Sequence, residues 1–159
     1  MNRRLTSAVA LLAVAALSSA PAHAATKKKP KPIRGSYAVH LNPDPTTDVF
    51  SEASQKNPTG EPCGLSTASE DRHAFKVPAA GTLHVVLDSP NPLPANYALG
   101  PDWDLHIMDA DGSELDASTS PEAHEETTDK FKKAQPLTIL VCNLTGGTDA
   151  KVSYTFTFA

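Results

Sequence analysis

Short segments of alternating apolar and polar residues recur along the second half of the chain, and they limit the fold more than any other feature. In residues 152–158, Val, Tyr and Phe alternate with Ser and Thr, which predicts a half-buried antiparallel strand. Residues 137–142 are apolar on both faces and predict a central strand that is covered on both sides. Further strands are expected at 37–41, 73–77, 83–87, 104–108, 114–118 and 127–131.

Turn residues separate these segments. Asp109-Ala110-Asp111-Gly112 predicts a tight hairpin with Gly112 at positive φ, and Gly146-Gly147 joins the last two strands. Residues 42–70 and 88–102 are rich in proline and predict long surface loops. Several short strands at roughly ten-residue spacing predict an all-β domain, either a sandwich or a barrel.

The N-terminus has the three parts of a secretory signal peptide. Arg3-Arg4 gives a positive start, residues 8–20 form an apolar run, and Ala22-His23-Ala24 has the small-x-small form of a cleavage site. The apolar run has 13 positions, whereas a membrane-spanning helix needs about 20. We therefore expect a secreted protein without a transmembrane segment, extracellular or associated with the cell wall. The sequence leaves the choice between the general and the twin-arginine export route open.

On this interpretation the chain has a signal peptide at 1–24, a flexible Pro/Lys-rich arm at 25–36 and one β-sandwich domain at 37–159. The arm is basic through Lys27, Lys28, Lys29, Lys31 and Arg34. Residues 35–159 hold 18 acidic against 7 basic residues, a formal charge of −11. The four lysines are expected to make weak contacts with polyanions such as wall polymers, and a solvated linker is the alternative. A domain of this charge is a poor partner for nucleic acid.

Cys63 and Cys142 are the only cysteines. An even count in an exported chain predicts a disulfide, and two cysteines allow one intramolecular pairing. The bond is expected to tie the irregular stretch 42–70 to the end of the central strand and to stabilise the fold by about 4–5 kcal/mol. Two free buried thiols are the alternative.

Three longer motifs occur in sequence order. They are HAFKVPAAGTLHVVLDS at 73–89, DWDLHIMDADGSEL at 102–115 and LTILVCNLTGG at 137–147. Together they resemble the bacterial pre-peptidase C-terminal domain over about residues 72–158, although Pro136-Leu137-Thr138 replaces the usual Gly-x-Tyr of that family. The resemblance implies a jelly-roll-like antiparallel β-sandwich of about eight strands. It also implies an accessory role, such as adhesion to a substrate or matrix, and calcium binding in some members.

Four aspartates frame the expected strand at 104–108 and its hairpin, namely Asp102, Asp104, Asp109 and Asp111. Carboxylate oxygens are the ligands that Ca²⁺ prefers. Asp104 and Asp109 lie about 16 Å apart along an extended chain, so the two pairs cannot share one ion. We predict that Asp102 and Asp104 bind Ca²⁺ together with Glu125 and Glu126 from a second loop. The alternative is that Asp104 pins a strand and that Asp109 and Asp111 form Asx-turns.

Trp103 is the only tryptophan, and two roles fit it. It is expected either to fill the end of the sandwich core or to serve as a stacking platform that binds a sugar or peptide. His84 and His106 alternate with apolar residues and are expected to be exposed, where they could form a weak zinc pair if their strands are neighbours.

Motifs of hydrolytic enzymes are missing from the sequence. It has no G-x-S-x-G or H-E-x-x-H motif, and the disulfide would occupy both cysteines. We therefore predict no enzymatic activity. The predicted function is a secreted accessory or binding β-sandwich that takes Ca²⁺ as its only cofactor and adheres to an extracellular polymer or protein. A metal-free partner of another secreted protein, such as a protease, is the alternative, and a small hydrolase is the least supported one.

Overall fold

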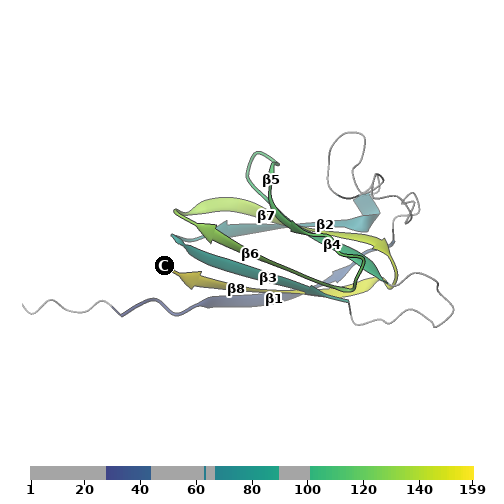
Figure 1. The fold of residues 1–159 in the computed structure, drawn as a ribbon, viewed down its shortest axis with the longest axis horizontal. Coiled ribbons are helices and arrows are strands. Elements are labelled where there is room, and N and C mark those ends of the chain that lie inside the picture. Colours follow the sequence, from purple (N-terminus) through teal and green to yellow (C-terminus); the bar gives the residue numbers. More distant parts are fainter. Residues whose placement is uncertain (1–27, 44–62, 64–66, 90–100) are drawn as a thin grey trace, which may run out of the picture.

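The protein is an eight-stranded β-sandwich. The computed structural model describes residues 28–43, 63, 67–89 and 101–159 (Figure 1). Its strands are β1 (Ile33–His40), β2 (Glu70–Val77), β3 (Gly81–Asp88), β4 (Asp102–Met108), β5 (Glu114–Ser118), β6 (His124–Phe131), β7 (Gln135–Thr145) and β8 (Asp149–Phe158), with one short 3₁₀ turn, η1 (Thr67–Ser69). The predicted all-β fold class is confirmed.

Two four-stranded sheets pack face to face, as Figure 1 shows. The first has the order β1-β8-β3-β6 and the second β2-β7-β4-β5, and every pairing is antiparallel. The paired strands include β1 with β8, β2 with β7, β3 with β6 and β4 with β5. This is the pairing of one long hairpin that is rolled up into two sheets. This strand order is that of a jelly roll, so the expected architecture is confirmed.

The core lies between the sheets because alternate side chains of each strand point inward. Leu83, Val85 and Leu87 of β3 are fully buried, as their spacing predicts. Val152 and Phe156 of β8 lie beside them in the same sheet, and Tyr154 and Phe158 are partly buried against the core. Each fully buried side chain of this size stabilises the fold by about 1.5–3 kcal/mol.

Strand β7 is buried on both faces, as its apolar sequence predicts. Leu137, Ile139 and Val141 belong to the core, while the alternate residues form a second apolar cluster on the outer face of the sheet. That outer cluster consists of Cys63, Met108, Leu140, Cys142 and Leu144.

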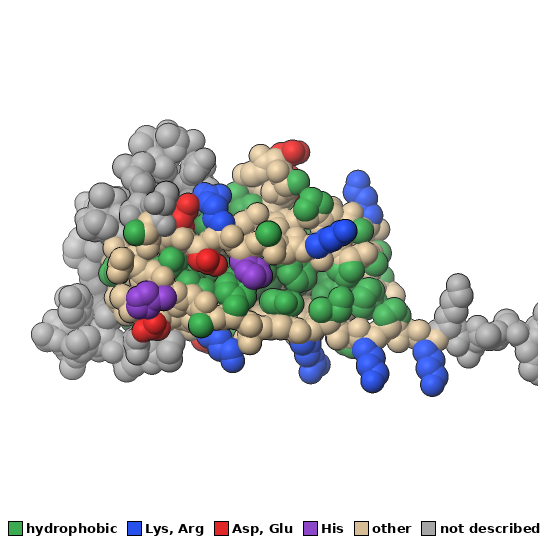
Figure 2. Space-filling view, turned by 180° about the vertical axis from the view of Figure 1, so that it is seen from behind, with side chains coloured by type: hydrophobic (Ala, Val, Ile, Leu, Met, Phe, Trp, Pro, Cys, Tyr) green, Lys and Arg blue, Asp and Glu red, His purple; other side chains and the backbone are tan. Residues whose placement is uncertain are grey.

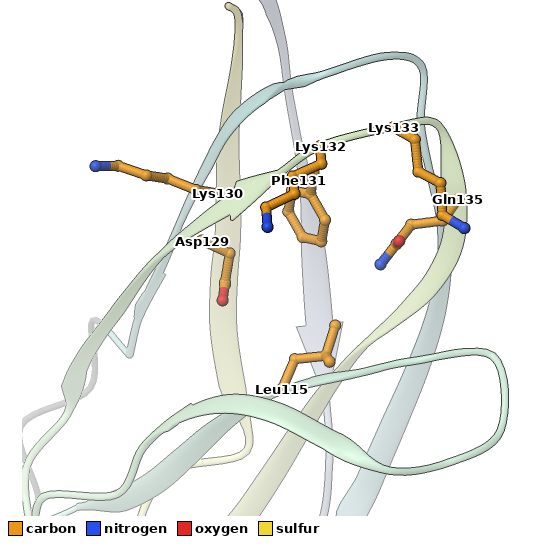
Figure 3. Close-up of a pocket in the computed structure, with 7 residues that line it drawn as sticks. All are labelled: Leu115, Asp129, Lys130, Phe131, Lys132, Lys133 and Gln135. Atoms are coloured by element: carbon orange, nitrogen blue, oxygen red, sulfur yellow. The ribbon is translucent and has the colours of Figure 1, made fainter.

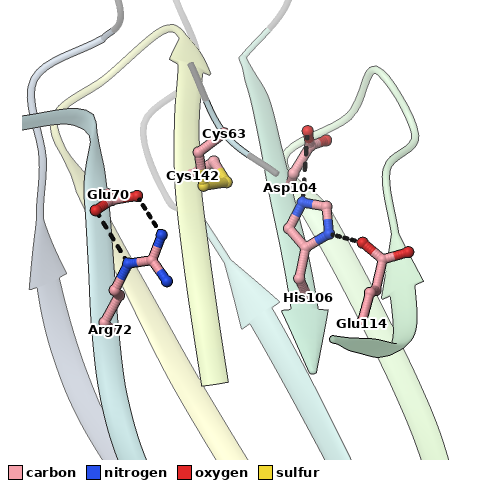
Figure 4. The surroundings of a disulfide bond; sticks show 7 residues. All are labelled: Cys63, Glu70, Arg72, Asp104, His106, Glu114 and Cys142. Carbon is pink, nitrogen blue, oxygen red and sulfur yellow. Dashed lines mark hydrogen bonds and ion pairs between the residues drawn. A yellow bond between two sulfur atoms is a disulfide. The ribbon is translucent and has the colours of Figure 1, made fainter. Parts of the chain in front are cut away.

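The predicted disulfide is confirmed. Cys63 and Cys142 are bonded, with their Cα atoms 5.4 Å apart, within the usual range for a disulfide (Figure 4). The bond fastens a residue of the irregular stretch before β2 to the middle strand pair of the second sheet.

Two local predictions are confirmed and one boundary differs. Gly112 has φ of 81° in the β4–β5 turn, and residues 37–40 of the strand expected at 37–41 fall in the edge strand β1. However, β1 begins at Ile33, so the last residues of the predicted arm, including Arg34, pair with β8 instead of remaining outside the sheet.

The signal peptide, its cleavage site at Ala22 and Ala24, and Lys27 lie outside the described residues. Within the described part of the chain, no helix has the length and hydropathy needed to cross a membrane.

Candidate functional site

Three carboxylates are buried close together where β4 and β6 begin. Asp102 and Asp104 come from the start of β4, and Glu125 is the second residue of β6. Their exposed fractions are 7%, 2% and 1%. The backbone N–H of Trp103 donates to the carbonyl oxygen of Glu122 at 3.3 Å, which holds the start of β4 against the segment leading into β6. We call Asp102, Asp104 and Glu125 the acidic cluster.

The β5–β6 connection fixes Glu125. Ser118 Oγ at the end of β5 and Ser120 Oγ in the connection both donate to the Glu125 carboxylate. Glu125 lies opposite Leu87 in the pairing of β6 with β3, so its side chain shares the inward face with Leu87. The two serines therefore provide hydrogen bonds to a charge that would otherwise be stranded in the interior.

Glu126 does not share this site with Glu125. Both residues lie within β6, and successive residues of a strand point to opposite faces. Glu126 is exposed, and its Oε2 lies 3.3 Å from His84 Nε2 on the outer face. The prediction that Glu125 and Glu126 act together from one loop therefore disagrees with the strand geometry.

Burial and mutual repulsion perturb the aspartates of the cluster. Burial, followed by Asp102, Glu125 and Glu114, raises the pKa of Asp104 to about 8. Burial and then Glu125 raise the pKa of Asp102 to about 6. The Oδ1 atoms of both aspartates are buried and have no hydrogen-bond partner. Charges so close together in a poorly solvated site need either a proton or a cation to offset their repulsion.

His106 extends the acidic cluster along the outer face of β4. Its Nδ1 lies 2.9 Å from Glu114 Oε2, and its Nε2 lies 3.9 Å from Asp104 Oδ2 (Figure 4). Burial lowers the pKa of His106, although the Glu114 contact acts in the opposite direction. His106 Nε2 has no hydrogen-bond partner, so it is not paired with a hydroxyl nucleophile as the base of a catalytic triad is.

The structure overturns the expected exposure of His106 and decides between the two roles that fit Trp103. His106 is buried, not exposed, because both faces of β4 are covered. It cannot pair with His84 around a zinc ion, since β3 and β4 belong to different sheets. Trp103 is fully buried in the core, so it fills the sandwich and cannot be the predicted binding platform.

The hairpin aspartates are separate from the cluster, as predicted. Asp109 Oδ1 accepts hydrogen bonds from the backbone N–H groups of Asp111 and Ser113, both at 2.9 Å. This pattern is the Asx-turn that the sequence offers as the alternative to a metal site.

The acidic cluster has the ligand atoms of a calcium site, but these atoms are not placed around one common point. Carboxylate and hydroxyl oxygens are hard ligands suited to Ca²⁺. As the side chains stand, the described residues contain no group of three or more His, Cys, Asp or Glu that could hold a metal ion. Asp104 lies with His106 on the outer face of β4, opposite Cys142, whereas Glu125 points inward from β6, so the three carboxylates do not form one ligand set as they stand.

Sequence reasoning missed Ser118, Ser120, His106 and Glu114 as neighbours of the aspartates. Serines and single charges are common in the chain, and their approach depends on which strands pair. Ser118 faces inward because it pairs with Leu105 of β4, which the apolar Leu115 and Ala117 of β5 do not predict.

A second surface feature lies between the edge strands β1 and β2. Tyr37 of β1 stacks on His73 of β2 with ring centroids 4.0 Å apart, and Phe75 meets Tyr154 edge-on at 5.0 Å. Figure 2 shows hydrophobic side chains exposed on one face of the molecule, with Lys and Arg along its lower margin. We call Tyr37, His73, Phe75 and Tyr154 the aromatic face.

Comparison with known proteins yields only remote structural matches. No family model and no curated protein matches the chain. One similar solved structure is the pre-peptidase C-terminal domain of a collagenase from Bacillus anthracis. It has 12% identity and a TM-score of 0.38, covering 78% of this chain and 85% of that one. Another is a mitogen derived from Yersinia pseudotuberculosis, with 12% identity and a TM-score of 0.39, covering 82% of this chain and 87% of that one. The collagenase domain bears the name of the family that residues 73–147 resemble, while the fold assignment itself rests on the strand order.

Proposed function

We propose that this protein is a secreted, non-catalytic binding module that takes up Ca²⁺ at its acidic cluster and adheres to an extracellular polymer or protein. The observation that carries the proposal is the burial of Asp102, Asp104 and Glu125, three carboxylates from two sheets, with the charge of Glu125 raising the pKa of both aspartates. Two buried oxygens of this group lack any hydrogen-bond partner. Burying unpaired polar atoms is costly, so such atoms need a ligand or a proton to offset the cost.

Calcium fits this group better than a softer metal does. All three side chains offer only oxygen donors, and Glu125 is already oriented by Ser118 and Ser120. Ca²⁺ accepts irregular sets of oxygen ligands and includes water in its coordination shell. Binding would link the start of β4 in one sheet to the start of β6 in the other, and would stabilise the folded state by mass action.

The aromatic face supports the adhesive part of the proposal. Its side chains are only partly buried, and aromatic rings at a surface give large contact areas to sugars and peptides. The exposed Lys28, Lys29 and Lys31 precede β1, the strand that holds Tyr37, and would add attraction to polyanions.

Calorimetry and thermal unfolding test the calcium site. In protein freed of metal with EDTA and then dialysed, we expect CaCl₂ at up to millimolar concentration to release or absorb heat and to raise Tm. Asp104→Asn should remove both effects, whereas Asp111→Asn is the matched control, because Asp111 is exposed in the separate hairpin. No heat and no Tm shift in the unaltered protein would contradict calcium binding and favour the metal-free alternative.

Retention on insoluble polymers tests adhesion independently. Wall polymer, chitin and collagen are the probes, each with Ca²⁺ and with EDTA. We expect retention on at least one of them and its loss in Phe75→Ser, while Lys76→Ser, which changes an exposed residue of the same strand, should be retained normally. Passage through all three columns would contradict the adhesive role toward these polymers.

A further inference from the structure

A cavity of about 520 Å³ opens at the end of β6 remote from the acidic cluster (Figure 3). Its lining comes from β5, from the end of β6 and from the turn into β7, namely Leu115, Asp129, Lys130, Phe131, Lys132, Lys133 and Gln135. Phe131 is six residues from Glu125 along β6, which corresponds to about 20 Å of strand. The cavity is therefore a separate site.

The floor of this cavity is apolar. Phe131 lies against it and is 9% exposed, while Leu115 projects toward it from β5 and is 44% exposed (Figure 3). Leu115 is one of the two large hydrophobic side chains that are exposed among the described residues. An exposed leucine facing a buried phenylalanine across a cavity is a place where an apolar ligand group would be taken out of water.

Two kinds of charge stand beside this apolar floor. Lys132 and Lys133 are consecutive residues of the β6–β7 turn, and their side chains extend to opposite sides, Lys132 toward Asp129 and Lys133 toward Gln135 (Figure 3). Within the described residues neither lysine takes part in an ion pair. Lys130 extends away from the other lining side chains. Asp129 points toward the side of Leu115, and its Oδ2 is buried without a hydrogen-bond partner.

We propose that this cavity binds the C-terminal end of a polypeptide whose last residue is apolar. The terminal carboxylate would lie between the ammonium groups of Lys132 and Lys133, and the last side chain would lie on Leu115 and Phe131. Asp129 would accept a hydrogen bond from a backbone N–H of the same segment. The cavity volume is within the usual range for sites that take small ligands.

The carboxyl of Asp129 distinguishes a peptide end from other anionic amphiphiles. A fatty acid also has a carboxylate and an apolar group, but it has no N–H to offer to Asp129 Oδ2. In a peptide end, the amide nitrogen that carries the N–H donor lies two bonds from the carboxylate carbon. The lining therefore offers a partner to the carboxylate, to the N–H donor and to the apolar side chain of one short peptide segment.

Fluorescence anisotropy with two labelled peptides tests this proposal. The probe is Gly-Gly-Gly-Leu with a free C-terminal carboxylate, and the comparison is the same peptide as its C-terminal amide. We expect the free acid to bind about tenfold more tightly than the amide, because the amide lacks the charge that the lysines recognise. The paired substitution K132Q/K133Q should weaken binding of the acid by about the same factor.

Lys151→Gln is the matched control, since this exposed lysine of β8 has the same charge and lies outside the cavity lining. It should bind the acid within about twofold of the unaltered protein. Equal binding of acid and amide, undiminished binding by K132Q/K133Q, or no binding at millimolar protein would overturn the proposal. Laurate displacing the acid peptide at equal concentration would also overturn it, in favour of a lipid site. The measurements are made in EDTA, so their outcome is independent of the calcium site.

Discussion

Replacement of Asp104 by asparagine tests the electrostatics of the acidic cluster. Asp104 is buried, and its pKa is raised from 3.8 to about 8 by burial and by its carboxylate neighbours. A raised carboxyl pKa means that the folded protein holds a proton that the unfolded chain has already released. The metal-free protein should therefore lose stability as the pH rises from about 4 to about 8. Above about pH 8, Asp104 should cause little further change in the free energy of unfolding.

The size of the effect follows from the pKa displacement. Each pKa unit corresponds to about 1.4 kcal/mol, so a displacement of about 4 units sets a ceiling of roughly 5–6 kcal/mol at high pH. The pKa of Asp102 is also raised, and the two carboxyls titrate together. Removing the charge of Asp104 alone should therefore restore only about 2–4 kcal/mol of the stability that is lost at high pH. Asparagine has the shape of the protonated acid and no charge at any pH.

The assay is thermal unfolding followed by circular dichroism in EDTA at pH 4.5 and pH 8.5. We expect D104N and the unaltered protein to unfold at similar temperatures at pH 4.5. At pH 8.5 the variant should be the more stable protein, by about 10 °C in Tm. Asp111→Asn should follow the unaltered protein at both pH values. If the difference between D104N and the unaltered protein does not grow with pH, the carboxyl is ionised without cost and the reasoning is wrong.

Two further substitutions test the packing. Cys63→Ser with Cys142→Ser opens a loop with a sequence separation of 79 and should lower the free energy of unfolding by about 4–5 kcal/mol in urea titration, while the far-UV spectrum remains that of a β-protein. An unchanged urea midpoint would show that the bond constrains little. Trp103→Ala should lower the free energy of unfolding by about 3–5 kcal/mol because it empties a fully buried site. Trp103→Phe should lower it by clearly less. Equal stability of the alanine variant and the unaltered protein would contradict the placement of Trp103 in the core.

Local patterns were sufficient to predict most of the strands. The alternation in β3 and β8 has the period of a strand with one buried face, and the apolar run in β7 identifies a strand that is covered twice. Asp109–Gly112 defines its own turn, because Asx hydrogen bonds and a glycine at positive φ act within a few residues. Two cysteines leave one intramolecular pairing, and the structure contains it.

The acidic cluster could be only half predicted. Asp102 and Asp104 are conspicuous along the chain, but the choice between Glu125 and Glu126 depends on which face of β6 turns inward. That strand is an edge strand with few apolar residues, so its hydrophobic pattern does not fix its orientation. The burial of His106 was hidden for a related reason, since polar residues on β4 suggest a solvent-exposed face.

The sequence by itself determined that this chain forms short strands, where most of them turn, and which cysteines pair, because these properties depend on neighbouring residues or on simple counting. Only the tertiary structure decided that β3 and β4 lie in different sheets, that Trp103 is core, and that Glu125 is buried while Glu126 is exposed. Those outcomes depend on non-local strand pairing, in which a shift of one residue exchanges the two faces of a strand.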